Sequence, residues 1–331
     1  MTMICQAQAR RCVPLICVAL AAATLALPAA AQQPYPAKPV NIVVPFPAGG
    51  SSDAMGRILA AELQAQLGQS FVVENRGGAN GGIGSVAVAR AVPDGYTLLI
   101  SGVGSNAINY GLYNKLPYAD KDFAHISLLA TGPNVLVVNP EFPAKTIQEF
   151  LKLVKASPGK YQAANSGNGS SNHLGMQMLE SAAGFKITPV PYKGGAAAIS
   201  DTLAGHVPIL TLNQDVLLPY VKSGKLRPIA VFSAERNPSY PNVPTIAESG
   251  FPGFSAVSWF GLAAPAGTPK AIIDKLAAAS EKAMANPKVK EKLEAAGFVV
   301  VGSSPAKANE FVKAEIERWG KTVRESGAVI E

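Results

Sequence analysis

The sequence predicts an α/β protein with two lobes joined by a hinge over a central cleft. Short apolar runs alternate with segments of helical spacing, which is typical of strands buried in a largely parallel sheet and covered by helices. The alternation stops at a bridging region and then resumes, and 331 residues is the length of about two domains. We expect the chain to cross between lobes near Gly132 and near Phe254. Residues 32–131 with 254–331 would then form one lobe and residues 132–253 the other.

The first 31 residues have the pattern of a secretory signal peptide. A basic pair at positions 10 and 11 precedes an apolar run over residues 12–27, and three alanines then offer a cleavage site after Ala31. An uncleaved membrane anchor is the alternative, but Pro28 and the alanine-rich end favour cleavage and export to the periplasm. The leader contains all three cysteines of the chain, Cys5, Cys12 and Cys17. The expected mature protein therefore has no thiol for a disulfide, a metal or a nucleophile.

Strands are predicted where short apolar runs occur, and helices where apolar residues recur every three or four positions. In the first half the predicted strands are residues 40–44, 71–73 and 96–100. Two helices are predicted between them, one from Ser51 to a stop at Gly68 and one over residues 80–91. This repetition of strand and helix is the unit from which α/β sheets are built.

The same alternation resumes in the second half. Thr146 and Glu149 have the spacing of a capping box, which predicts a helix to Ala156. Pro208 and Pro228 cannot donate to a β-ladder, so their strands are expected to lie at an edge or to begin there. The other predicted strands and helices are strands 135–138, 161–164, 207–212, 226–231, 257–262 and 298–301, helices 172–183 and 196–204, and helices that begin at Pro269, Pro287 and Pro305.

Two turns resemble each other, Gly49–Asp53 in the first half and Asn168–Asn172 in the second. Each follows a predicted strand and opens a predicted helix, where free N–H groups and the helix dipole favour an anion. Simple N-capping by the same residues explains each turn equally well when it is taken alone. Because such loops gather at one cleft, we expect the pair to grip opposite ends of one anionic ligand. Neither turn contains Lys or Arg, so backbone amides and hydroxyls would hold that ligand.

Other motifs argue against several functional classes. The three histidines, at positions 125, 173 and 206, lack metal-ligand spacing, so neither a metal nor another cofactor is expected. His173, beside a helix start, is the one candidate base for an enzyme. Gly102–Ala107 fits a dinucleotide pattern, but no long helix or acidic strand end follows it. The net charge of +7, or +5 without the two leader arginines, is not clustered as nucleic-acid binding requires.

Short motifs of one receptor family occur in order along the mature chain: Tyr35–Val40, Val43–Asp53, Val73–Ala79, Pro93–Leu98, Ser166–Ser170, Pro191–Gly194, Gly224–Arg227 and Trp259–Pro269. Together they resemble the Bug-type solute-binding receptors, the extracytoplasmic components of tripartite tricarboxylate transporters. The resemblance implies a type II periplasmic-binding-protein fold that closes on a small organic anion and performs no chemistry.

The resemblance also implies which residues hold the ligand. In that family the turns matching Phe46–Ser52 and Ser166–Ser170 hold carboxylates, and the loop after the third strand faces the cleft. One position departs from the family, since Leu212 stands before Asn213 where an aspartate is frequent. The predicted ligand-binding residues are Phe46, Ala48, Gly49, Ser51, Ser52, Ser105, Asn106, Ser166, Asn168, Gly169, Ser170, Tyr192 and Asn213.

The predicted function is that of a periplasmic receptor, a monomer, that captures a small carboxylate-bearing anion by lobe closure and delivers it to membrane permease subunits. Two alternatives stay open at this point: a protein that supplies ligand to a signalling partner, and an exported hydrolase of small acids that uses His173. Mono-, di- and tricarboxylates, acidic amino acids and aromatic acids all fit such a site. Phe46 and Tyr192 would suit either a ring or an aliphatic ligand.

Overall fold

The computed structural model describes residues 35–326, so the predicted signal peptide lies outside the described residues. Its ten strands form one sheet with the order β2-β1-β3-β9-β4-β7-β5-β6, and β8 and β10 also pair with β4. The bounds of the strands are β1 Val40–Val44, β2 Phe71–Asn75, β3 Thr97–Gly102, β4 Phe123–Val138, β5 Gln162–Asn165, β6 Thr188–Pro191, β7 Ile209–Asn213, β8 Arg227–Val231, β9 Val257–Pro265 and β10 Val299–Val300.

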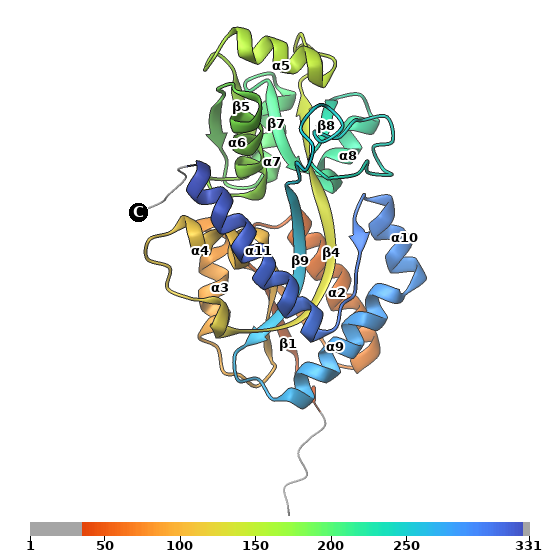
Figure 1. The fold of residues 1–331 in the computed structure, drawn as a ribbon. Coiled ribbons are helices and arrows are strands. Elements are labelled where there is room, and N and C mark those ends of the chain that lie inside the picture. Colours follow the sequence, from red (N-terminus) through yellow and green to blue (C-terminus); the bar gives the residue numbers. More distant parts are fainter. Residues whose placement is uncertain (1–34, 327–331) are drawn as a thin grey trace, which may run out of the picture. The chain divides into compact units, whose positions relative to one another are not determined.

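Helices cover the sheet between these strands (Figure 1). The bounds of the α-helices are α2 Ser51–Leu67, α3 Gly82–Ala89, α4 Asn109–Leu112, α5 Ile147–Ala156, α6 Ser171–Ala183, α7 Gly195–Leu203, α8 Gln214–Lys222, α9 Lys270–Ala285, α10 Pro287–Ala295 and α11 Pro305–Ser326. Every helix predicted from the sequence is present, within a few residues at its ends. Strand β6, residues 123–134 of β4 and helices α4 and α8 were not predicted; α8 carries a proline at position 219, which weakens its helical signal.

The longest strand, β4, joins two groups of strands. Over residues 123–133 it pairs with β9, and over residues 134–138 it pairs with β7, with β8 alongside residues 135–138. Figure 1 shows β4 and β9 running together between the two groups. This change of partner falls next to Gly132, the first predicted crossing point, while the lobe boundaries themselves stay a prediction.

The expectation of a largely parallel sheet is wrong for the middle of the sheet. The outer strands are parallel, since β1 pairs in parallel with β2 and β3, and β5 with β6 and β7. In the centre, β9 runs antiparallel to β3 and β4, and β4 antiparallel to β7. Strands covered on both faces are apolar whatever their direction, so the apolar runs carried no information on strand polarity.

The two proline predictions for strands are confirmed. β7 begins at Ile209, directly after Pro208. β8 contains Pro228 and pairs with β4. The missing ladder donors therefore fall where the sheet does not need them.

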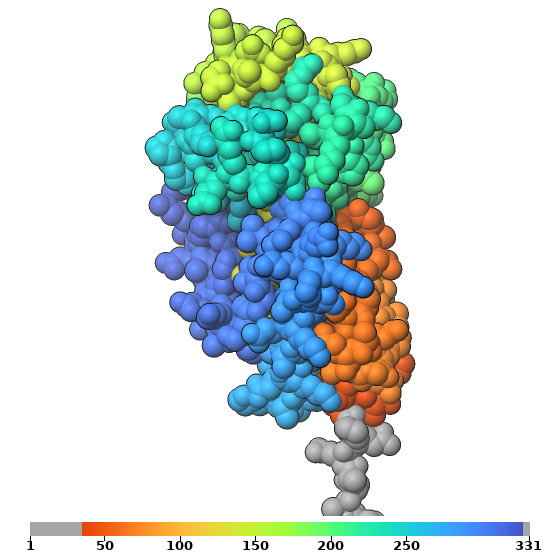
Figure 2. Space-filling view, turned by 90° about the vertical axis from the view of Figure 1, so that its right-hand side faces the viewer, coloured from red at the N-terminus to blue at the C-terminus, as the bar shows by residue number. Residues whose placement is uncertain are grey.

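Helix α2 lies unusually close to the sheet. A Cβ atom on Gly56 would lie 2.8 Å from Cγ2 of Val44 in β1 and 3.3 Å from Cγ1 of Ile100 in β3. Helix α9 packs along the other side of α2 (Figure 2), where Gln66 Nε2 donates to the carbonyl of Ala279 at 3.1 Å. The position of α2, and therefore of its N-terminus, is fixed from both sides.

Helix α11 packs against the apolar core through one face. Trp319 is fully buried, and Phe311 and Ile316 pack against the same apolar cluster. The indole Nε1 of Trp319 donates to Oε2 of Glu315 at 3.0 Å, which satisfies the polar atom of this large buried side chain.

Replacing Gly56 by valine tests the close approach of α2. The added methyl groups overlap with Val44 and Ile100, and overpacking of this kind costs about 1–3 kcal/mol of the free energy of unfolding. Urea denaturation should show this loss for Gly56→Val. Ala61→Val, on the exposed side of the same helix, is the matched control and should change the stability by less than about 0.5 kcal/mol. Equal stability of the two variants would contradict the packing described here.

Candidate functional site

A cavity of about 440 Å³ lies at the carboxyl ends of β1, β3, β5, β6 and β7. Its wall is drawn from residues 46–52 and 102–104, from within residues 166–172, 193–200 and 212–220, and from residues 258–260 with Asn80. Loops at the carboxyl ends of parallel strands are where α/β proteins bind small molecules. The volume lies in the range of cavities that enclose a small organic ligand.

Eight of the thirteen predicted residues line this cavity, namely Phe46, Ala48, Gly49, Ser51, Ser52, Ser166, Ser170 and Asn213. The other five, Ser105, Asn106, Asn168, Gly169 and Tyr192, do not belong to its wall. The structure therefore brings the two predicted turns together at one cavity but separates some of their neighbours from it.

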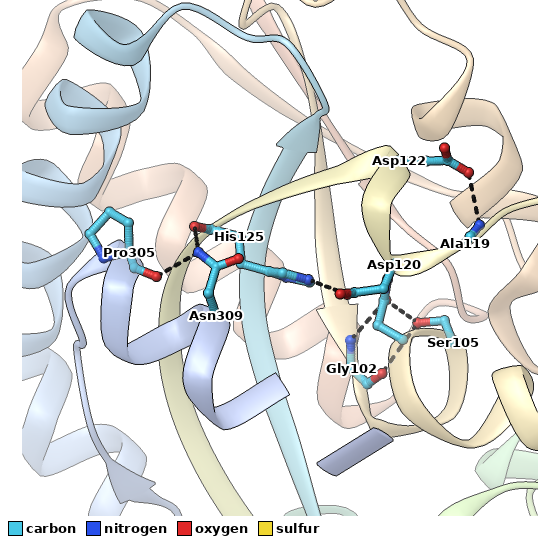
Figure 3. A network of polar contacts seen from close by, with 9 residues as sticks. Gly102, Ser105, Ala119, Asp120, Asp122, His125, Pro305 and Asn309 are labelled. Carbon is cyan, nitrogen blue, oxygen red and sulfur yellow. Dashed lines mark hydrogen bonds and ion pairs between the residues drawn. The ribbon is translucent and has the colours of Figure 1, made fainter. Parts of the chain in front are cut away.

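The loop after β3 faces the cavity through its backbone at Gly102–Gly104, not through Ser105 or Asn106. Both of these side chains are fully buried, and the Ser105 hydroxyl donates to Oδ1 of Asn106 at 2.7 Å. Figure 3 shows Ser105 turned toward this loop and toward Gly102. The expected contact of these two side chains with a ligand is thus replaced by contacts that hold the loop in shape.

Tyr192 and Gly169 also have structural partners. The phenol of Tyr192 donates to Oδ2 of Asp201 at 2.5 Å, which ties its ring to α7. Gly169 has a φ of +72°, and a Cβ on it would overlap with the side chain of Leu112. Its carbonyl accepts a hydrogen bond of 2.8 Å from Nδ2 of Asn80. Both residues therefore support the cavity wall through contacts within the protein and do not line the cavity themselves.

The turn from β1 into α2 leaves the start of the helix open. Gly50 is the N-cap residue, and no side-chain hydrogen bond caps α2. The carboxylate of Asp53 instead accepts from the Gly49 amide at 3.0 Å and from Nδ2 of Asn75 at 3.0 Å. Burial by itself would raise the pKa of Asp53, but its hydrogen bonds with Arg57, Gly49 and Asn75 lower it below the ordinary value. The first amides of α2 are thus left for another acceptor.

In the turn from β5 into α6, side chains accept hydrogen bonds from nearby backbone amides of the same segment. Ser170 caps α6 by accepting from the amide of His173 at 3.3 Å, and the Gly169 amide donates to Nδ1 of His173 at 3.1 Å. The Ser166 amide donates to Oδ1 of Asn172 at 3.0 Å. N-capping, the alternative that the sequence left open, is confirmed for this turn. Burial lowers the pKa of His173, so its ring accepts this bond in the neutral form.

A third helix start at the cavity was missed in the sequence. Gly194 is the N-cap residue of α7 and has no capping side chain, and Gly194–Ala196 line the cavity beside Lys193. A Cβ on Gly194 would lie 3.4 Å from Cγ of Pro47, so this turn adjoins the one before α2. The signal in the sequence was the Gly-Gly pair directly before a predicted helix, but it lacked the serines that marked the other two turns.

One contact ties Ser51 to the start of α8. The Ser51 hydroxyl donates to Oδ1 of Asp215 at 2.6 Å. Burial raises the pKa of Asp215 to about 6, although the bonds from Ser51 and from the amide of Val216 act in the opposite direction. Asp215 was not singled out in the sequence because its partner lies 164 residues away.

Within residues 35–326, no group of His, Cys, Asp and Glu side chains has the arrangement of a metal site. In the same part of the chain, no helix has both the length and the apolar character needed to cross a membrane.

Comparison with known proteins gives consistent matches. The family described as "Tripartite tricarboxylate transporter family receptor" matches residues 55–328. Protein BugT of Bordetella pertussis is 38% identical over 323 residues, which cover 97% of this chain and 99% of BugT. The solved structure of periplasmic binding protein BugD has a TM-score of 0.85 and 36% identity, covering 90% of this chain and all of that one.

A second solved structure, R. palustris Rpa4515 with adipate, has a TM-score of 0.86 and 35% identity, and covers 88% of this chain and 98% of that one. These likenesses confirm the predicted fold class, the type II periplasmic-binding-protein fold.

The pKa of Asp215 gives a pH-dependent prediction. Its folded-state pKa of about 6 lies above the ordinary value of 3.8, so between these values the unfolded chain releases the proton first. The wild type should therefore lose stability relative to Asp215→Asn as pH rises from about 4 to about 6, by about 3 kcal/mol in total. Denaturation curves at several pH values measure this difference.

Asp53→Asn is the control of opposite sign. Because the folded-state pKa of Asp53 is lowered, its stabilisation is present above the ordinary pKa and is lost as pH falls. A stability difference for Asp215→Asn that does not vary over this range would show that Asp215 is not desolvated.

Proposed function

The chain belongs to the tripartite tricarboxylate transporter receptor family, and from this premise we propose that it is a periplasmic solute-binding receptor. It captures a small carboxylate-bearing organic anion by lobe closure and delivers it to the membrane subunits of a tripartite tricarboxylate-type transporter. Export to the periplasm rests on the signal-peptide pattern of the first 31 residues. The ligand class is supported by the relative whose structure is described with adipate.

The observation that carries this proposal is the open start of α2 at the wall of a cavity of about 440 Å³. Unpaired amides at a helix N-terminus and the helix dipole both favour a carboxylate. The start of α7 adjoins that of α2 through Gly194 and Pro47, and Lys193, which also lines the cavity, directly precedes Gly194. A carboxylate placed there meets donors from two elements and one positive charge.

Closure follows from where these donors come from. α2 belongs to the first predicted lobe, and α7 and Lys193 belong to the second. A carboxylate shared between them is satisfied only when the lobes are together, so its binding favours the closed arrangement. The bonds Ser51–Asp215 and Asn80–Gly169 join the same two parts of the chain.

The proposal involves binding without chemistry. His173, the one candidate base in the sequence, does not line the cavity, and its Nδ1 is engaged by the Gly169 amide. A general base must reach the proton it removes, directly or through one water. The ring of His173 instead supports the turn before α6.

Replacing Gly50 by aspartate tests the anion site. Gly50 has a φ of −93°, which any residue adopts, and the nearest atom to an added Cβ is 3.8 Å away. An aspartate there caps α2 and places a negative charge where the ligand carboxylate is proposed to bind. Affinity for the strongest binder in a panel of organic acids should fall at least about tenfold, while Tm without ligand stays equal or rises. Calorimetric titration and thermal melts measure the two quantities.

Gly50→Ala is the matched control, because it adds the Cβ without a cap or a charge, and it should keep the affinity of the wild type within a few-fold. Undiminished binding by the aspartate variant would refute the assignment of α2. A wild type that binds no acid of the panel would refute the proposed function itself.

A further inference from the structure

We infer that the ligand carries a single carboxylate on an uncharged, mainly apolar body, and that the cavity selects against a second carboxylate. This rests on the proposed function and specifies its substrate class. Three features of the wall lead to it: the distribution of charge, the commitment of the serine hydroxyls, and the apolar face formed by α7 and α8.

The charge on the wall is limited to one group. Lys193 is the only ionisable side chain of either sign among the described residues that line the cavity, apart from the phenol of Tyr220. It directly precedes Gly194, the N-cap residue of α7, so the cation belongs to the same stretch of the wall as this open helix start. One carboxylate is neutralised there, and a second one would have no cation.

Several serine hydroxyls of the wall are engaged within the protein. Ser51 donates to Asp215, as described above, and the Ser170 hydroxyl lies 2.7 Å from the carbonyl of Gly167 and 2.9 Å from Oδ1 of Asn172. The Ser166 hydroxyl and the side-chain amide of Asn172 also pair with each other. A hydroxyl whose proton is committed offers a ligand its lone pairs, which suits an N–H or O–H group and repels a carboxylate. The Ser170 hydroxyl, in the turn before α6, is therefore a poor donor to a second carboxylate, and no residue of this turn that lines the cavity carries a positive charge.

Much of the remaining wall is apolar. It is formed by Ile199 of α7, by Leu212 of β7, and by Val216, Pro219 and Tyr220 of α8, with Phe46 of the turn after β1 and Phe260 of β9. An ionised carboxylate against such a surface would lose its hydration without gaining hydrogen bonds. A hydrocarbon chain or ring is stabilised there by burial, at about 25 cal/mol for each Å² removed from water.

The test compares two pairs of acids with matched skeletons at pH 8. Hexanoate and adipate share a six-carbon chain, and cyclohexanecarboxylate and cyclohexane-1,4-dicarboxylate share a ring. Calorimetric titration of the wild-type protein should give at least a tenfold lower Kd for the monoacid of each pair. A diacid that binds as tightly as its monoacid, or more tightly, overturns this inference and leaves the proposed function standing. Absence of binding by all four acids overturns both.

Lys193→Met provides a second readout. It should weaken the binding of both acids of a pair at least several-fold, because it removes the cation proposed to meet the carboxylate that they share. Undiminished affinity of this variant for both acids would contradict the role given to Lys193.

Discussion

The backbone amides at the start of α2 impose the constraint on which the site depends. An N-terminal helix amide needs an acceptor, and most helices supply one from a capping side chain. Here Gly50 holds the N-cap position, and the nearby carboxylate of Asp53 is turned back to the Gly49 amide and Asn75. The glycine at position 56, which lets α2 lie against β1 and β3, keeps this open helix start at a defined place on the cavity wall. The cavity, the adjoining turn before α7 and Lys193 are arranged around that place.

The order of the elements could largely be predicted from the sequence, because apolar spacing and proline positions are local properties. The direction of the strands could not be predicted in the same way. β4 and β9 return through the sheet in opposite directions, and buried strands of either polarity are equally apolar. Helix α8 was missed because Pro219 interrupts its pattern.

The sequence predicted two of the turns that line the cavity, but not which polar groups those turns leave free for a ligand. Residues 46–52 line the cavity as expected from their glycines and serines. The turns before α2 and α6 look alike in sequence, yet only the second is capped by its own serine, Ser170. That distinction depends on which atoms accept each amide, and composition does not reveal it. Asp215 could not be found at all, since its role follows from a contact with Ser51 over 164 positions of sequence.

Ser51 connects ligand binding to closure, because it takes part in both. Its position at the start of α2 places it beside the proposed carboxylate, while its hydroxyl holds Asp215 of the other predicted lobe. The raised pKa of Asp215 shows that this arrangement disfavours the charged form of that side chain. If the lobes part, Asp215 regains water and that cost disappears. In the proposed receptor this cost opposes closure at neutral pH, and the contacts of the ligand with α2, α7 and Lys193 would offset it.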